Sequence, residues 1–440
     1  MSLLVKNARI LNPDGKLSDG KNILVERGKI KRFFELPDET ELNKDHHILD
    51  CKGDFVVPGF MNCHTHLFQC FGRGLMDDIE LAKWLEIIWK FPELFSEEAI
   101  YYSTLIGAIE TLKTGSVSVA EIIIPGISED VVAEAITSTG LRLVYGKMAN
   151  DYMEGSNTPV RSTEKSLQEA EDFYHKWHGK NNGRITTKFT FMGLPAASKE
   201  LVKGIGELSR KYGVGIHTHA AEGKTATMKV RERFGMKEIR ALESFDVLGE
   251  ATQLADVIWI DNEEIEILKK TGTTVIHCPL TNCKLTDGLS PMYKFQKTGI
   301  NIAFGTDGAA SSSNHDLLLE ARTGAMLQKV ASMDSTSFDA PSVFRMLCRG
   351  AGYSGFKNPG ELNEGDPADF LVLDSSDSRF LAEESVLNNL IYASTGKEII
   401  KDVIISGEVV VKNRETTLIS EEETVLKAKE ILEKEKHKLL

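Results

Sequence analysis

Four groups of polar residues recur in a fixed order along the chain, and each ends a short apolar run that is typical of a β-strand. The groups are His64-Thr65-His66, His219-Ala220-Ala221-Glu222, His277 and Thr306-Asp307. A strand turns alternate side chains to the same face, so His64 and His66 can reach one ion together. Three imidazoles and a carboxylate suit a borderline divalent ion, and we predict zinc, with iron as the alternative.

The sequence around these groups resembles the amidohydrolase superfamily, in the branch that contains cytosine deaminase, chlorohydrolases and S-adenosylhomocysteine deaminase. The resemblance is carried by residues 58–66, 73–75 with 84–85, 277–282 and 305–310, and it continues through residues 360–370 and 405–410. The resemblance covers nearly the whole chain. The ordered motifs are specific for the family and much less specific for the substrate.

The resemblance implies one divalent ion and no second one. Its ligands would be His64, His66, His219 and Asp307. His217 shares a strand face with His219 and is the alternative ligand. The family places its metal-binding histidine three residues before a glutamate, which favours His219 and leaves His217 as a supporting or core residue. Two-metal relatives usually add a carboxylated lysine or a glutamate at strand four, where this chain offers only Lys188 in mid-strand.

The chemistry of such a site depends on a water molecule and a proton carrier. A divalent ion lowers the pKa of its bound water from about 15.7 towards about 7 and so supplies hydroxide at neutral pH. Glu222 lies three residues after His219, in the turn that leaves the strand. It can take the water proton and return it to the leaving group. By resemblance, Glu222 is the proton shuttle, and Asp307 both binds the metal and assists the transfer.

Three further residues are predicted to contact the substrate. His277 ends an apolar run within a family motif, and it is expected to line the pocket rather than to bind the metal. Trp84 belongs to the motif that follows residues 73–75, and His315 opens a helix-like segment just after the Asp307 loop. The alternative for each is a core or surface residue without a role in the reaction.

Two departures from the family pattern bear on the reaction. Strand six of the family ends in a histidine near the metal-bound water, and this chain has Asp256 there unless the alignment is displaced. An ionised carboxylate cannot donate a hydrogen bond, but it can orient water or hold a cationic amidine or ammonium group. After strand four, nucleoside deaminases of this branch usually have His-Ala-Pro-Tyr-Thr, and residues 192–198 of this chain are small and mostly apolar. This difference weakens the carry-over of an adenosine-like substrate from the family and favours a flatter or more apolar one.

Strand-like and helix-like segments alternate through the middle of the chain, which predicts an α/β fold, a (β/α)8 TIM barrel over residues 59–364. Besides the runs before the two histidine motifs, strands are predicted at residues 116–122, 141–147, 185–193, 257–260, 273–277 and 300–304. Helices are predicted at residues 96–112, 162–176, 199–211, 226–242, 263–270 and 316–329. Catalytic groups of such barrels gather at the carboxyl ends of the strands, where each motif lies.

Both ends of the chain contain short β-like runs with turn signals such as Asn12-Pro13-Asp14-Gly15. We predict one small β-domain from residues 1–58 and 365–440, and the resemblance implies a β-sandwich beside the barrel. Residues 421–440 have a charged helical pattern with little apolar area. This helix is expected to be a surface strut or a contact of a homo-oligomer.

Composition excludes some classes of partner. Of the 440 residues, 41% are hydrophobic and 27% are charged, and the formal net charge is −13. This charge, without a long basic run, argues against nucleic acid and anionic membranes as partners. No apolar run approaches the roughly 18 residues of a membrane span. The first residues lack the zones of a secretory signal, so we expect a cytoplasmic protein.

Three functions are compatible with these residues. The first is a hydrolytic deaminase that releases ammonia from an amino-substituted nitrogen heterocycle, such as a purine, pyrimidine, pterin or triazine. The second is a related hydrolase that expels chloride, an alkylamine or an amide nitrogen and differs only in its pocket. The third is a non-catalytic binding module, which would be marked by lost ligands, and none is lost. We therefore expect a metal-dependent amidohydrolase of carbon–nitrogen bonds other than peptide bonds.

Overall fold

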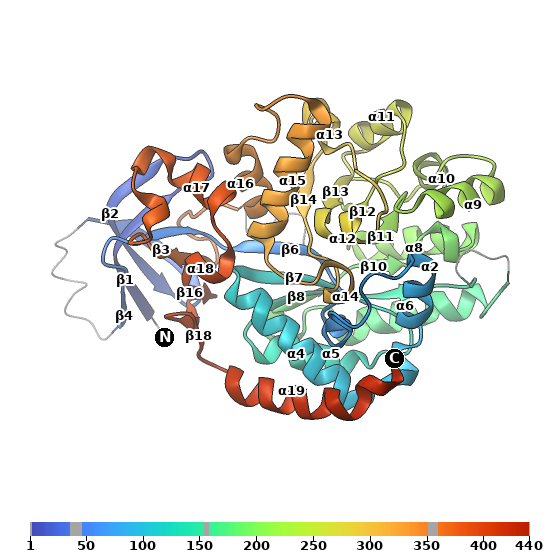
Figure 1. Ribbon diagram of the computed structural model, residues 1–440, viewed down its shortest axis with the longest axis horizontal. Helices are drawn as coiled ribbons and strands as arrows, with labels where there is room; N and C mark the ends of the chain where they lie inside the picture. The colour runs from blue at the N-terminus through green and yellow to red at the C-terminus, as the bar shows by residue number, and fades with distance from the viewer. Residues whose placement is uncertain (1, 36–45, 154–157, 351–359, 440) are drawn as a thin grey trace.

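The computed structural model describes residues 2–35, 46–153, 158–350 and 360–439. Parallel strands at eight positions form a nearly closed barrel (Figure 1). In chain order the strands are β6 (Phe60–Thr65), β7 (Ser116–Ile123), β8 (Arg142–Ala149), β9 (Ile185–Thr187) with β10 (Phe189–Phe191), β11 (Ile216–Ala220), β12 (Thr252–Asp256), β13 (Thr274–His277) and β14 (Ile302–Phe304). A parallel bridge between Thr65 and Asp307 joins the first strand to the segment after the last. The predicted (β/α)8 barrel is confirmed.

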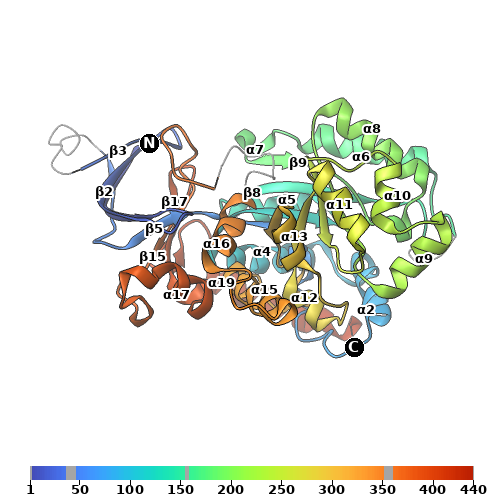
Figure 2. The same cartoon turned by 90° about the horizontal axis from the view of Figure 1, so that it is seen from above.

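Helices surround the barrel and follow its strands (Figure 2). They are α2 (Leu81–Ile88), α3 (Phe91–Leu94), α4 (Glu97–Lys113), α5 (Glu129–Ser138), α6 (Thr163–Trp177), α7 (Lys180–Gly183), α8 (Lys199–Tyr212), α9 (Lys224–Phe234), α10 (Glu238–Ser244), α11 (Asn262–Thr271), α12 (Pro279–Lys284), α13 (Met292–Thr298), α14 (Ala309–Ser312), α15 (Leu317–Ser332) and α16 (Ala340–Arg349). Helix α11 shows why such segments begin and end where they do. Asp261 and Glu264 form a reciprocal capping box at its start, and Gly272 ends it with a φ of 70°.

The sixth strand lies earlier than the sequence predicts. The apolar run at residues 257–260 was the expected strand, but the strand is Thr252–Asp256, which is buried throughout and pairs in register with β11. After Asp256 the chain leaves the sheet: Val257 has a φ of 48°, and the next two amides donate to the carbonyl of Ala221. This correction moves Asp256 to the carboxyl end of the strand.

Two other predicted elements are divided. The helix predicted at residues 226–242 is two helices, because Gly235 takes a left-handed φ of 71° and ends α9 before α10 begins. The strand predicted at residues 185–193 is interrupted at Lys188, which lies between β9 and β10.

A small apolar cluster fills the barrel interior. Its members come from strands that are not neighbours, such as β8 and β13, so the cluster lies inside the barrel rather than under the helices. It contains Met61, Cys63, Ala120, Val144, Ile276, Cys278 and Ala303.

The two ends of the chain meet in a second, nine-stranded sheet. Its strands are β1 (Ser2–Leu11), β2 (Leu17–Glu26), β3 (Lys29–Phe34), β4 (His47–Asp50), β5 (Phe55–Pro58), β15 (Phe370–Leu373), β16 (Ile400–Ile405), β17 (Glu408–Lys412) and β18 (Glu415–Thr416). Strand β5 joins the termini, because it pairs with β1 on one side and with β15 on the other. The predicted β-domain from both termini is present as one hydrogen-bonded sheet beside the barrel (Figure 2).

Further helices come after the barrel in the sequence. Helices α17 (Val386–Ala393) and α18 (Gly396–Ile399) lie between β15 and β16. The final helix, α19 (Glu421–Glu435), runs along α4 of the barrel (Figure 1). The hydroxyl of Ser96 donates to Glu435 at 2.6 Å, and Lys113 pairs with Glu421. A role of this helix in an oligomer remains a prediction.

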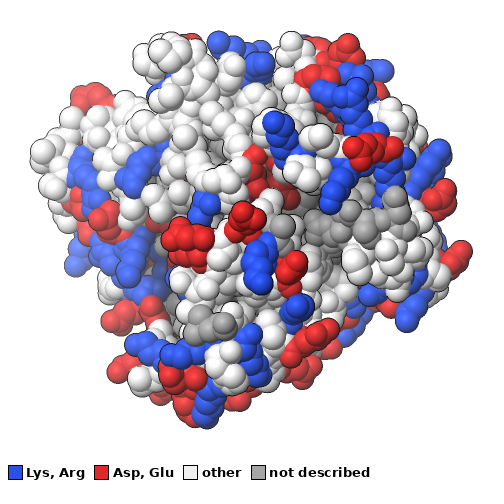
Figure 3. All heavy atoms as spheres, turned by 45° about the vertical axis from the view of Figure 1, so that its right-hand side comes forward, with Lys and Arg blue, Asp and Glu red and all other residues white. Residues whose placement is uncertain are grey.

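The surface is mixed in charge. On the face drawn in Figure 3, basic and acidic side chains are interspersed and form no single large basic area. None of the helices in the described part of the chain is long and apolar enough to cross a membrane.

Candidate active site

The His-x-His motif lies where β6 ends, and a buried glutamate fixes the turn that follows it. Glu121 on β7 accepts the amide of Leu67 at 2.9 Å and the hydroxyl of Thr65 at 2.7 Å. Burial raises the pKa of Glu121 to about 8. Sequence reasoning missed this residue, although an acidic side chain within the apolar run of β7 was a usable signal.

Three imidazoles converge at the carboxyl ends of β6 and β11. The ligand atoms of His64, His66 and His219 lie within 4.8 Å of one another. Each ring uses its Nδ1 elsewhere: His66 donates to the carbonyl of Ile122 at 2.6 Å and His219 to that of Met192 at 3.2 Å, while His64 bonds to His217.

This arrangement leaves Nε2 of each ring free for a ligand bond. The Nε2 atom of His64 is buried and has no hydrogen-bond partner among the described residues. Such an atom is costly unless something binds to it. Three imidazoles whose ligand atoms converge in this way fit a divalent ion such as zinc.

Asp307 completes the group. Its Oδ1 lies 3.6 Å from Nε2 of His64 and 3.4 Å from Nε2 of His66, and the hydroxyl of Ser311 donates to its other oxygen at 2.7 Å. Burial acts to raise the pKa of Asp307, but the facing histidines hold it below its ordinary value. The loop can approach so closely because Gly305 has no side chain: a Cβ there would meet His64 at 2.7 Å.

His217 lies behind this group rather than in it. Its Nε2 is 2.9 Å from Nδ1 of His64, and the two rings are stacked. Burial, together with the nearby charges of His64 and Lys188, lowers the pKa of His217 well below its ordinary value. The ring is therefore neutral and can fix the orientation of His64, which agrees with the expected supporting role.

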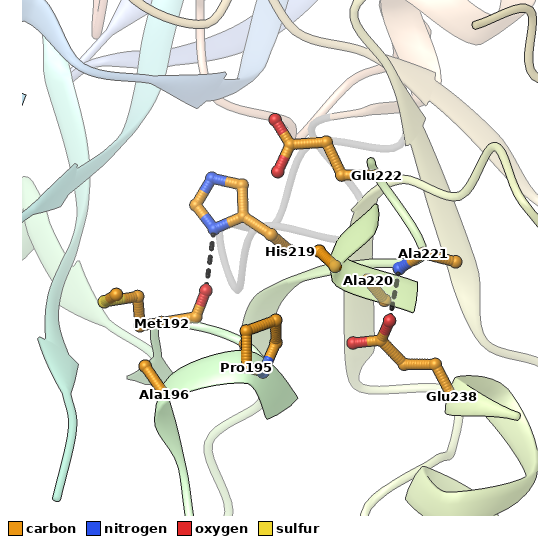
Figure 4. Close-up of a pocket in the computed structure, with 10 residues that line it drawn as sticks. Met192, Pro195, Ala196, His219, Ala220, Ala221, Glu222 and Glu238 are labelled. Atoms are coloured by element: carbon orange, nitrogen blue, oxygen red, sulfur yellow. Dashed lines mark hydrogen bonds between the residues drawn. The ribbon is translucent and has the colours of Figure 1, made fainter. Parts of the chain in front are cut away.

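A pocket opens beside His219. It is lined by Met192, Gly193, Pro195, Ala196, His219, Ala220, Ala221, Glu222, Ala226 and Glu238. Figure 4 shows the carboxylate of Glu222 next to the ring of His219, with Glu238 on the other side of the turn. Glu238, which sequence reasoning also missed, accepts the amide of Ala221 at 3.0 Å and so anchors the turn that carries Glu222.

Asp256 lies at the same end of the barrel. It is buried, it accepts a hydrogen bond from Nδ2 of Asn282 at 2.8 Å, and its backbone takes a left-handed φ of 75°. Burial, with a contribution from Asp307, raises the pKa of Asp256 to about 6. The structure thus brings this carboxyl group into the electrostatic surroundings of Asp307 and His64, as the alignment with the strand-six histidine requires.

The three predicted substrate contacts lie in packed surroundings. The ring of Trp84 is buried and its Nε1 donates to the carbonyl of Ala310 at 3.3 Å. His315 is fully buried, between the hydroxyl of Thr306 at 3.0 Å and the thiol of Cys70 at 3.4 Å. These two residues support the Asp307 loop, and neither lines the pocket beside His219.

His277 points away from the metal ligands. Its ring lies against the ring of Phe304 and close to Gly324 of α15, whereas the preceding residue, Ile276, belongs to the cluster inside the barrel. Successive strand residues face opposite sides, so His277 faces the helix layer. We therefore correct the prediction that His277 lines the pocket.

Comparison with known proteins agrees with this geometry. The profile of the Amidohydrolase family matches residues 55–410. A 5-methylthioadenosine/S-adenosylhomocysteine deaminase of Halothermothrix orenii is 32% identical, over 98% of this chain and 99% of its own.

Two solved structures contain zinc and share the fold. An adenosine deaminase from Xanthomonas campestris with bound zinc has a TM-score of 0.89 and 23% identity, over 99% of this chain and 98% of its own. An atrazine chlorohydrolase from Arthrobacter aurescens complexed with zinc has a TM-score of 0.89 and 22% identity, over 98% and 100%. The chain belongs to the amidohydrolase family and is a hydrolase of carbon–nitrogen bonds other than peptide bonds.

Proposed function

We propose that the protein is a hydrolytic deaminase that uses one zinc ion to replace the amino group of a nitrogen heterocycle with oxygen. The observation that carries the proposal is the position of Glu222 beside His219, on the wall of a pocket and next to three convergent imidazoles. The deaminase name of the H. orenii relative, which aligns over nearly the full chain, supports ammonia as the product.

The proposed ligands are His64, His66, His219 and Asp307. When bound, the ion supplies Lewis-acid activation of a water molecule. The protein holds the ligand rings in place beforehand, because each Nδ1 is bonded to a carbonyl or to His217. Such bonds orient a ligand and set which nitrogen faces the ion.

Glu222 is the proposed proton carrier. As a carboxylate it accepts a proton from the attacking water, and as a carboxylic acid it donates that proton to the departing nitrogen. One water is consumed, one ammonia leaves, and the ring carbon gains an oxygen. Glu238 keeps Glu222 in place through the amide of Ala221, and Asp307, held by Ser311, assists the transfer.

The pocket wall indicates the kind of substrate. The side chains of Met192, Pro195 and Ala196 on this wall are apolar, which suits the face of a flat ring. This wall stands where the family's nucleoside deaminases carry a histidine motif, so we propose a purine, pyrimidine, pterin or triazine-like ring without assigning a ribose contact.

Ammonia release from a panel of these aminated rings tests the proposal. Zinc-loaded protein should release ammonia from at least one ring, and protein stripped with a chelator should not. Chloride and alkylamine release from substituted triazines would be measured in parallel. Release of chloride or an alkylamine in place of ammonia would overturn the deaminase assignment and favour the related hydrolase.

A further inference from the structure

A group of polar side chains beside the metal ligands has no part in the reaction described above. Asp256, at the end of β12, Asn282, on α12, and Asp287, just after α12, are exposed by only 3%, 2% and 4%. The amide of Asn282 donates to Asp256 at 2.8 Å. It also lies near Asp287, because it lowers the pKa of that carboxyl. We call these three residues the acidic recess.

The acidic recess has more acceptors than donors. Both carboxyl oxygens of Asp287 and the Oδ1 atom of Asn282 are buried and have no hydrogen-bond partner among the described residues. A buried acceptor without a donor costs about 1–3 kcal/mol, and more when it is charged. Asp287 supplies one donor when it holds a proton, and the remaining acceptors are open to donors from outside the chain.

The acidic recess lies at the same end of the barrel as the metal ligands, because Asp256 pairs with Ala220, the residue after His219. Burial, with the charges of Asp256 and Asp307, raises the pKa of Asp287 to about 8. The indole Nε1 of Trp259 donates to the carbonyl of Asp287 at 2.7 Å, and Trp259 is 38% exposed. The backbone of Asp287 is thus tied to a partly exposed aromatic residue.

We infer that the acidic recess binds a cationic, N–H-donating edge of the substrate, such as an amidinium or guanidinium group. This inference rests on the proposed function and names the substrate's charge. An amidinium carries donors and positive charge in one plane, which matches carboxylate acceptors in geometry and sign. A second metal ion is a poorer match. Among the described residues, the group of three or more His, Cys, Asp or Glu side chains with ligand atoms close enough to hold an ion is His64, His66 and His219.

Benzamidine and benzamide provide a matched pair of probes, because they have nearly the same shape but only benzamidine is a cation at neutral pH. Calorimetric titration of zinc-loaded wild type should show benzamidine binding at least ~10-fold more tightly than benzamide, as expected for a charge-assisted contact. Asp287→Asn should lower this ratio, because only Asp256 then remains as a carboxyl in the acidic recess, while affinity for benzamide stays similar. Asp402→Asn, which removes a buried carboxyl in the terminal sheet, is the control and should keep the wild-type ratio.

Three results would overturn the inference. These are a wild-type ratio near one, an unchanged ratio in Asp287→Asn, or a second zinc equivalent that wild type binds and Asp287→Asn loses. The wild-type ratio needs no variant, so the inference can be refuted even if Asp287→Asn does not fold. Ammonia release is measured separately: ammonia without charge preference refutes the acidic recess alone, and charge preference without ammonia refutes the proposed function alone.

Discussion

Glu238 allows a direct test of how the turn carrying Glu222 is held. Its carboxyl is buried and accepts the amide of Ala221 at 3.0 Å. Burial raises the pKa of Glu238 from 4.5 to about 7. Between these values the folded protein keeps a proton that the unfolded chain has released, so stability must fall as pH rises through this window. Replacing Glu238 with glutamine removes the titration.

The size of the effect follows from the two pKa values. At about 1.36 kcal/mol per pH unit, wild type loses about 3 kcal/mol over the whole window and about 2 kcal/mol between about pH 5.5 and about pH 8. The unfolding free energy of Glu238→Gln, minus that of wild type, should therefore rise by about 2 kcal/mol over that range. Urea unfolding of zinc-loaded protein, followed by circular dichroism, measures it. Glu243→Gln, which removes an exposed carboxylate from the same helix, is the control. A difference that stays constant with pH would refute a proton-holding carboxyl at this position.

Further predictions concern the metal ligands and the pocket. His219→Ala should remove the ion, measured by elemental analysis, and full occupancy in that variant would make His217 the ligand instead. His217→Ala should keep the site but weaken zinc affinity roughly 10- to 100-fold in competition with a chelator; equal affinity would contradict its contact with His64. Asp256→Asn should lose turnover, because asparagine carries no charge for a cationic edge, whereas retained turnover would indicate a carboxyl that acts as a donor. Glu238→Ala removes the acceptor of the Ala221 amide, which costs the position of the turn that carries Glu222 about 1–3 kcal/mol, so the turnover rate should fall roughly 5- to 150-fold. An unchanged turnover rate would show that the turn does not depend on Glu238.

The sequence was sufficient to predict the barrel and the residues that meet at its open end. Alternating apolar segments indicated strands and helices, and parallel strands of a barrel end at one face. Motifs that end strands, such as His64 with His66 and the pair His219 and Glu222, therefore had to be neighbours even though more than a hundred residues separate them. The structure brings them together in this way.

The remaining features depend on contacts that local pattern does not contain. Strand six was misplaced because its buried residues include polar ones, while the more apolar run beside it forms the following turn. His277 was placed in the pocket because it ends a strand, but its face is set by the register of β13 with its neighbours. Glu121, Glu238 and Asp287 act on segments far from them in sequence. The one local sign for Glu121 was a carboxyl group in an otherwise apolar strand.

The measurement that tests the central claim most directly compares wild type with Glu222→Gln. Zinc content and single-turnover ammonia release would be determined on the same preparations, with the best ring from the substrate panel. If Glu222 carries the proton and the histidines with Asp307 hold the ion, the variant keeps its zinc and its rate falls by ~10²-fold or more. A variant with full zinc and near-normal ammonia release would contradict the account and move the proton transfer to Asp307 or Asp256.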